Sequence, residues 1–140
     1  MSPPTTLQPP VAPQVEPTVR PSSDFLELVV RSGGHNVVRC YQCRKCTNGC
    51  PLASEMDIKP NQVMRAVQLG LRQEVLGSRT IWICAACQTC TTRCPNDIDI
   101  AHVMDVLRQL CNLVGDELVE PNVSKFKRVV FDSIRRHRRV

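Results

Sequence analysis

Eight of the nine cysteines in this 140-residue chain fall into two runs with the same spacing. The first run holds Cys40, Cys43, Cys46 and Cys50, and the second holds Cys84, Cys87, Cys90 and Cys94. Both runs read C-x2-C-x2-C-x3-C-P, and each cysteine of the second lies 44 residues after its counterpart. Thiolates at this spacing are typical ligands of cubane iron–sulfur clusters.

The predicted ligand sets are crossed between the two runs. In two-cluster proteins with this motif, the fourth cysteine of each run binds the cluster of the other run. One [4Fe–4S] cluster is therefore expected on Cys40, Cys43, Cys46 and Cys94. The second [4Fe–4S] cluster is expected on Cys84, Cys87, Cys90 and Cys50.

Two other uses of cysteine fit the pattern less well. A structural zinc site has four ligands, commonly as two separated pairs, whereas here there are eight, and each group of four ends in proline. A disulfide framework needs an oxidising compartment, and the N-terminus lacks the basic start and apolar middle of a secretory signal. A cytoplasmic location is expected. Direct membrane insertion is not, because no apolar run approaches the roughly 18 residues that a membrane span needs.

The elements that position the cysteines are expected to be helices. Apolar residues recur at helical spacing between the motifs, and no stretch alternates as a strand would. The expected helices cover residues 25–32, 72–76, 98–114 and 122–136, with another that starts at Pro60. The predicted fold class is therefore all-α: an α-helical ferredoxin that holds two clusters in loops at helix ends.

Three segments of different composition divide the chain. Residues 1–22 contain seven of the eleven prolines and are expected to form a disordered tail. Residues 23–117 form the predicted di-cluster domain. Residues 118–140 are expected to form a basic amphipathic helix, in which cations near the C-terminal end would complement the helix dipole. The basic and apolar character also suits docking to a larger subunit. Nucleic acid is not expected as a partner, because no recognition fold accompanies the charge.

Several single residues around the motifs carry expectations of their own. Trp82, the only tryptophan, is expected to shield a cluster from water, and ordinary core filling is the alternative role. Cys111, the ninth cysteine, is expected to be a buried, inert thiol. Asn96 or Asp97 is the expected cap of the helix that follows the second run. In the first helix, an inward stripe of Phe25, Leu28 and Val29 is expected.

The motifs and the residues beside them resemble those of the C subunit of heterodisulfide reductase. The resemblance is carried by Cys-Tyr-Gln-Cys at 40–43, by Thr-Ile-Trp-Ile-Cys at 80–84 and by the paired Cys-Pro endings, and it covers about residues 25–115. Arg44 departs from the family pattern, which has glycine before the Lys-Cys pair. This change is expected to affect loop geometry or the local potential rather than the ligands.

The resemblance implies a non-catalytic electron-transfer subunit. Such a subunit relays electrons through two [4Fe–4S] clusters between a flavin-containing A-type subunit, itself an iron–sulfur protein, and a disulfide-active B-type subunit. Iron–sulfur subunits of succinate or fumarate and of glycolate or glycerol-phosphate oxidoreductases are also similar, and a free-standing ferredoxin is a further alternative.

Missing motifs support a relay role. The chain has no Cys-Cys dipeptide, the mark of the disulfide-cleaving subunit, and no G-x-G-x-x-G dinucleotide fingerprint. No paired carboxylates or Ser/His constellation suggests hydrolysis. The sequence therefore predicts a chain that moves electrons and leaves the chemistry to its partners.

Overall fold

The computed structural model describes residues 22–114 and 121–138, and these residues are helical without any strand. The helices are α1 (Ser23–Arg31), η1 (Val37–Arg39), α2 (Lys45–Asn48), α3 (Pro60–Gln68), α4 (Arg72–Leu76), α5 (Thr80–Ile83), α6 (Thr89–Thr92), α7 (Ile100–Val114) and α8 (Pro121–His137). The described part agrees with the predicted all-α class and contains no helix long and apolar enough to cross a membrane. The predicted Pro-rich tail, apart from Ser22, and the domain boundary at residue 117 lie outside the described residues.

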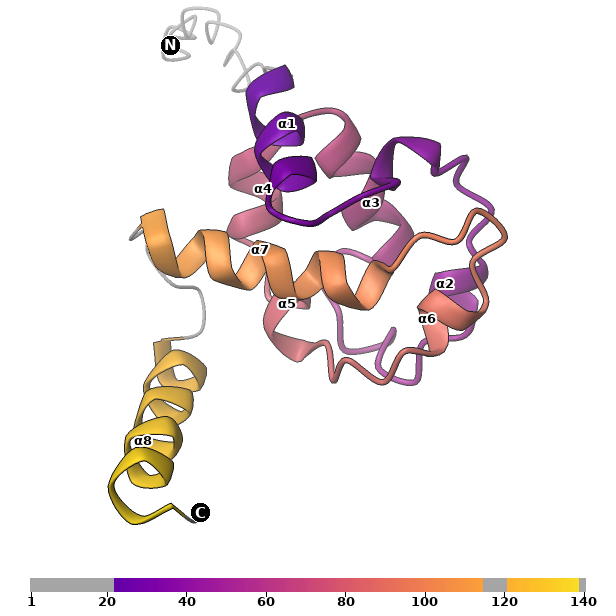
Figure 1. Cartoon of the computed structure of the whole chain (residues 1–140). Helices are drawn as coiled ribbons and strands as arrows, with labels where there is room; N and C mark the ends of the chain where they lie inside the picture. Colours follow the sequence, from indigo (N-terminus) through magenta and orange to yellow (C-terminus); the bar gives the residue numbers. More distant parts are fainter. Residues whose placement is uncertain (1–21, 115–120, 139–140) are drawn as a thin grey trace, which may run out of the picture.

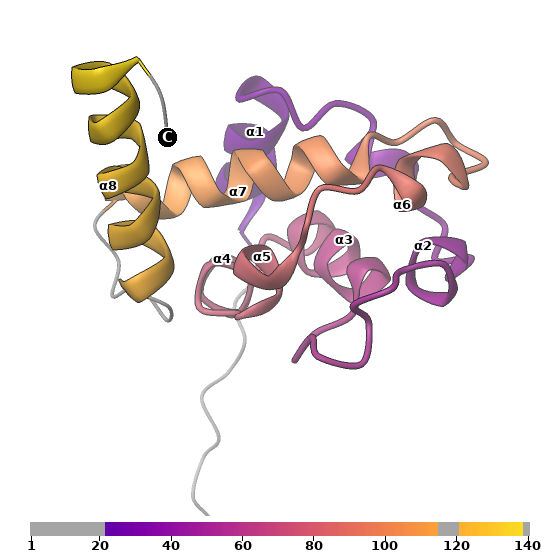
Figure 2. The same cartoon turned by 90° about the horizontal axis from the view of Figure 1, so that it is seen from below.

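Helix α7 is the spine of the domain. It packs against α1, α4 and α5, while α3 packs against α1 and α4 (Figure 1). The two short helices α2 and α6 lie side by side at the end of the molecule where α7 begins (Figures 1 and 2). The cysteine runs are therefore gathered at one end, where they pack against the hydrophobic core.

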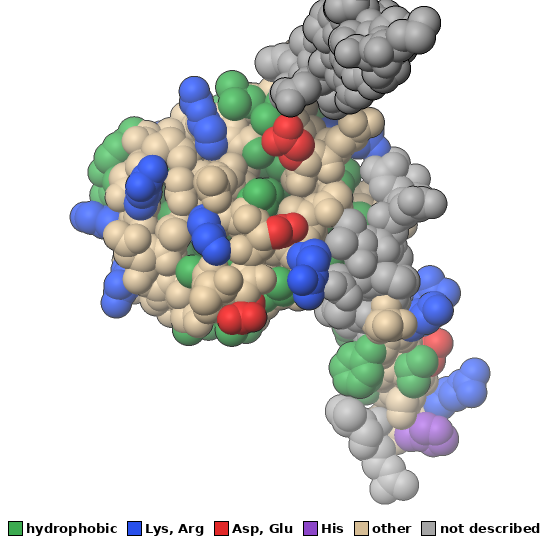
Figure 3. Space-filling model, turned by 180° about the vertical axis from the view of Figure 1, so that it is seen from behind, with side chains coloured by type: hydrophobic (Ala, Val, Ile, Leu, Met, Phe, Trp, Pro, Cys, Tyr) green, Lys and Arg blue, Asp and Glu red, His purple; other side chains and the backbone are tan. Residues whose placement is uncertain are grey.

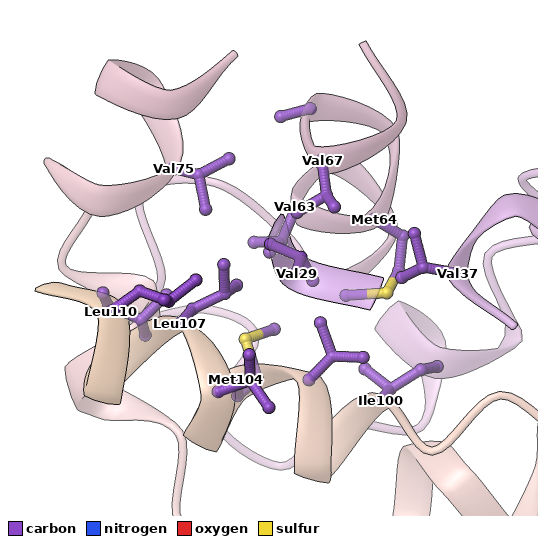
Figure 4. Close-up of a cluster of buried hydrophobic side chains, with 14 of the residues drawn as sticks. Val29, Val37, Val63, Met64, Val67, Val75, Ile100, Met104, Leu107 and Leu110 are labelled. Atoms are coloured by element: carbon purple, nitrogen blue, oxygen red, sulfur yellow. The ribbon is translucent and has the colours of Figure 1, made fainter. Parts of the chain in front are cut away.

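The core forms where the apolar faces of α3 and α7 meet (Figure 4). Val63, Met64 and Val67 project from α3, and Met104 and Leu107 project from α7; each is at most 1% exposed. Burying such side chains contributes roughly 1.5–3 kcal/mol apiece, so this interface holds the domain together. It also fixes where the N-termini of both helices stand relative to the cysteine loops.

Helix boundaries match the predictions at Pro60, at residues 72–76 and at Val114, and they differ at the start of α7 and at both ends of α1 and α8. Helix α7 begins at Ile100 instead of 98, and its cap is Asp99, not Asn96 or Asp97. The Asp99 carboxylate accepts a hydrogen bond of 3.0 Å from the N–H of His102. Residues 97–99 lie outside the helix: Asp97 has a left-handed backbone (φ 51°), and the Ile98 side chain is 1% exposed in the core. The expected inward position of Leu28 is also wrong, since it is 39% exposed.

Helix α8 stands beside the C-terminal end of α7 and projects from the domain in both views (Figures 1 and 2). Its large apolar side chains Phe126, Val129 and Phe131 are 67%, 67% and 63% exposed. Basic residues fill its last turn, as expected from the sequence.

Candidate iron–sulfur centres

Two hollows at one end of the domain are each lined by four cysteines. The first is lined by Cys40, Cys43, Cys46 and Cys94. The second is lined by Cys50, Cys84, Cys87 and Cys90. In each hollow, three thiols come from one run and the fourth comes from the other run. Cys43 and Cys87, the second cysteines of the two runs, are the exposed ones.

The two cysteine loops are built as repeats of one backbone design. Helices α2 and α6 begin 44 residues apart, like the cysteines, whereas α3 and α7 begin 40 residues apart. The residues on either side of the second cysteine adopt left-handed conformations in both loops: Gln42 and Arg44 (φ 64° and 61°), then Ala86 and Gln88 (φ 52° and 64°). Turns in which left-handed residues alternate with other residues are typical of concave nests of backbone N–H groups, which suit anionic groups.

A chain of hydrogen bonds links the first loop to the start of α3. The Thr47 hydroxyl donates to Asn61 Oδ1 at 2.6 Å and accepts from the Asn61 N–H at 3.2 Å. Asn61 Nδ2 then donates to Gln42 Oε1 at 3.1 Å, and Gln42 Nε2 donates to Cys40 Sγ at 3.2 Å. The position of the Cys40 sulfur is thus coupled to a buried helix terminus.

The second loop repeats the threonine contact but not the rest of the chain. The Thr91 hydroxyl donates to Asp99 Oδ1 at 3.0 Å and accepts from the Ala101 N–H at 3.3 Å. Sequence reasoning missed both threonines. The sequence could have identified them, because a threonine directly follows the third cysteine in both runs.

Burial and local hydrogen bonds give the thiols different acidities. Burial raises the pKa of Cys90 to about 11, helped by the nearby Cys84. Burial also raises the pKa of Cys46. The hydroxyl and backbone N–H of Thr89 lower the pKa of Cys87. Because a bound metal requires thiolates, loading of these hollows must release protons from the more buried cysteines.

The arrangement fits cubane clusters better than single ions. All nine cysteines are free of disulfides. In the residues that the structure describes, no three His, Cys, Asp or Glu side chains converge on a position for one metal ion. A cubane does not require this, since its four thiolates bind four different irons. Aliphatic side chains complete the walls, including Ile98 in the first hollow and Met104 in the second.

Two other expectations concern residues outside the hollows. Cys111 is buried in α7, as predicted, with its Sγ 3.8 Å from the carbonyl oxygen of Leu76. Trp82 is 7% exposed and belongs to the hydrophobic core. Its core-filling role is therefore confirmed, and its role as a shield for a cluster stays a prediction.

Comparison with known proteins agrees with these features. Residues 39–99 match the family model described as a 4Fe-4S dicluster domain. The two hollows and their flanking helix starts fall within or directly beside this range. The match supports the two [4Fe–4S] clusters expected from the cysteine spacing.

Curated relatives are subunits of one kind of enzyme. The C subunit of the H(2):CoB-CoM heterodisulfide,ferredoxin reductase of Methanothermobacter marburgensis is 32% identical over 85 residues, covering 61% of this chain and 46% of the relative. The second iron-sulfur C subunit of the CoB--CoM heterodisulfide reductase of Methanocaldococcus jannaschii is 35% identical over 103 residues, covering 68% and 55%. The iron-sulfur C subunit of the Methanopyrus kandleri reductase is 38% identical over 80 residues, covering 57% and 42%. The chain thus spans about half the length of the curated relatives it matches.

Proposed function

This chain is a relative of the C subunits of heterodisulfide reductases and has a 4Fe-4S dicluster domain, and from this premise we propose that it is an electron-relay subunit of a heterodisulfide-reductase-like complex. Its partners in the proposal are a flavin-containing A-type subunit, itself an iron–sulfur protein, and a disulfide-active B-type subunit. The observation that carries the proposal is the presence of two four-thiol hollows, each supplied by both cysteine runs.

The proposed ligand sets follow the lining of the two hollows. Cys40, Cys43, Cys46 and Cys94 would hold one cluster, and Cys84, Cys87, Cys90 and Cys50 would hold the other. When bound, such clusters supply one-electron oxidation and reduction and bring no substrate site with them. The protein would form an α-helical ferredoxin whose loops at the N-terminal ends of α3 and α7 carry the ligands.

The chain's own residues orient the thiolates and limit the access of water. Thr47 and Thr91 tie the loops to the helix starts, and Met104 and Ile98 wall the hollows with apolar surface. Exposed Cys43 and Cys87 mark the side of each hollow closest to solvent. A partner's redox centre could approach most closely at these two positions.

Helix α8 is the proposed docking element for a larger subunit. Phe126, Val129 and Phe131 expose apolar surface next to the cations Arg128 and Arg135. Figure 3 shows green apolar side chains beside blue basic ones on this projecting helix. An aromatic and basic surface of this kind is typical of a helix that buries its anchors against a partner.

Anaerobic loading and turnover test the relay proposal. The full chain should hold about eight iron and eight sulfide, and a low-potential reductant should reduce it. Disulfide reduction should require an added B-type subunit. Cys43→Ala should abolish that coupled activity, while Cys111→Ala, which alters a buried cysteine outside both hollows, should retain both clusters. Turnover of a disulfide by the chain alone would refute the relay role.

Truncation tests the docking proposal separately. A chain that ends before Pro121 should keep both clusters and lose affinity for its partner subunits. Phe126→Ala should weaken binding measurably, whereas the exposed Asp132→Ala on the same helix should have a smaller effect. Unchanged binding after truncation would leave α8 as a solvent-exposed helix only.

A further inference from the structure

Two side chains 40 residues apart occupy the same place in the two repeats. Gln68, at the end of α3, has its Nε2 within hydrogen-bonding distance of the carbonyl oxygens of Val37 and Cys40, at 3.1 and 3.0 Å. Arg108, in α7, donates from Nε to the carbonyl of Ile81 and from Nη2 to the carbonyl of Cys84. We call Gln68 and Arg108 the carbonyl clamps. Their acceptors are equivalent residues, 44 positions apart.

Both clamps donate hydrogen bonds to backbone carbonyl groups at the end of a short helical turn. The last carbonyl groups of a helical turn have no partner inside that turn. Here the turns of η1 and α5 end directly before Cys40 and Cys84. Each clamp donates to carbonyls of its turn and to the carbonyl of the first cysteine in its run, although the Val37 carbonyl also accepts the N–H of Cys40 at 3.1 Å. The two clamps thus perform one positioning task with different chemistry.

The clamps differ in charge. Gln68 is neutral, whereas Arg108 is a cation whose side chain is only 11% exposed. A charge held this far inside the protein is screened less than one at the surface. Reduction adds one negative charge to an iron–sulfur cluster, so a nearby fixed cation favours the reduced form.

Each clamp is itself oriented by the residue three positions before it. Asp105 accepts a hydrogen bond of 2.7 Å from Arg108 Nη1, and its side chain is 45% exposed. In the first repeat, Arg65 Nη1 donates to Gln68 Oε1 at 3.2 Å. Asp105 partly offsets the charge of Arg108, but its greater exposure to solvent weakens its field. The first repeat also has a cation, Arg65, but Arg65 is exposed, whereas the cation of the second repeat, Arg108, points inward where the first repeat has an amide.

We propose that Arg108 is a positioning residue that raises the reduction potential of the cluster held by Cys84, Cys87, Cys90 and Cys50. Gln68 does the same structural work beside the other cluster without a charge. This inference rests on the two-cluster part of the proposed function and is independent of the partner subunits. It makes the two repeats alike in ligands and backbone but different in electrostatics.

The test is a redox titration of the anaerobically loaded full chain, followed by electron paramagnetic resonance. Cys50→Ala and Cys94→Ala, each expected to leave one cluster, assign the two signals. Arg108→Gln should move the second cluster to a more negative potential and leave the first in place. Arg108→Lys keeps the charge without the two-carbonyl fork and should stay closer to wild type than Arg108→Gln.

Two further variants act in the opposite direction and control for loss of structure. Asp105→Asn removes the offsetting negative charge and should move the second cluster to a more positive potential. Gln68→Arg should raise the potential of the first cluster alone. Absence of these shifts in both variants, or equal shifts in Arg108→Gln and Arg108→Lys, would overturn the electrostatic role. A chain that binds no iron would instead contradict the two-cluster function, and this would be visible before any titration.

Discussion

The two halves of the domain share a backbone and differ in the side chains that support it. Helices α2 and α6, and then α3 and α7, begin at equivalent residues, and each run places left-handed residues around its second cysteine. The contacts behind the loops are not equivalent. Thr47 engages buried Asn61, whereas Thr91 engages exposed Asp99. The two halves thus share the backbone geometry that places the thiols, whereas the polar contacts around the loops differ between them.

The connection between loop and long helix is the second point of difference. Nine residues separate Cys50 from Pro60, but only five separate Cys94 from Ile100. The longer connection carries Asp57, whose carboxylate accepts hydrogen bonds from the N–H groups of Arg79 and Thr80 at 2.8 and 3.0 Å. The first half therefore caps α5, which leads into the second cysteine run. The halves are interdependent as well as similar.

Removal of the fourth cysteines is the most drastic way to break the comparison. Cys50→Ala should remove the cluster of the second run, and Cys94→Ala the cluster of the first, because each hollow takes its fourth thiol from the other run. Iron content should fall by about half in each variant.

Double variants decide whether ligation is crossed. Cys50→Ala with Cys87→Ala should cost one cluster, whereas Cys50→Ala with Cys43→Ala should cost both. Iron and sulfide analysis together with electron paramagnetic resonance provides the measurement. The reverse pattern would mean that each run binds its own cluster.

Loss of the threonine hydroxyl should destabilise the protein more in the first half, at Thr47, than in the second half, at Thr91. Thr47→Val should lower the free energy of unfolding by about 1–3 kcal/mol, because it leaves polar atoms of buried Asn61 without their partner. Thr91→Val should cost about 1 kcal/mol or less, since water can replace the hydroxyl at exposed Asp99. Anaerobic denaturant unfolding of the loaded proteins measures both. Equal costs would show that the two contacts are equivalent after all.

Substitution of Asp57 should lower the free energy of unfolding more than substitution of Asp97, which lies 40 residues later. Asp57→Asn should lower the free energy of unfolding by about 1 kcal/mol, because an amide nitrogen replaces one of the two carboxylate oxygens that accept the N–H groups of Arg79 and Thr80. Asp97→Asn should be close to neutral, because asparagine tolerates the left-handed conformation at φ 51°. Denaturant unfolding of both variants beside the wild type measures the difference.

The pH dependence of the Asp57 contribution follows from its hydrogen bonds. Burial tends to raise the pKa of Asp57, but hydrogen bonds from the Thr80 hydroxyl and the N–H groups of Arg79, Ile58 and Thr80 outweigh it and hold the pKa below its usual value. The stabilisation is therefore complete above the unfolded pKa of about 3.9 and is lost as the pH falls through the folded value. The stability gap between Asp57→Asn and wild type should stay constant from about pH 6 to 8. A gap that changes in this range would indicate another titrating group.

The smallest expected change in stability comes from substituting glycine for Arg44 or for its counterpart Gln88. Both adopt left-handed conformations that glycine enters without steric cost. Arg44→Gly and Gln88→Gly should each stabilise the domain by up to about 1 kcal/mol, the gain being limited by the greater flexibility of glycine in the unfolded chain. Thermal unfolding under anaerobic conditions measures this change. Destabilisation by Arg44→Gly alone would mean that the Arg44 side chain contributes contacts or charge that Gln88 does not.

The cysteine spacing determined the kind of cofactor without any coordinates, and the residues beside the motifs indicated the family to which the chain is related. Ligand chemistry is local: the residue type and its spacing along the chain restrict what can bind. Helical spacing of apolar residues likewise predicted the all-α class and the positions of α3 and α4. The departure of Arg44 from glycine was visible in the sequence, but its left-handed backbone was not.

Only the tertiary structure decided which polar side chains support the loops. Helix α7 starts two residues later than predicted, and Ile98 is buried in the core just before it. Leu28 is exposed although its spacing predicted an inward position. Gln68 and Arg108 carry no motif, and their equivalence appears only when the carbonyl groups that they contact are known. Such contacts join residues 24–31 positions apart. They depend on how the helices pack, which local sequence patterns do not encode.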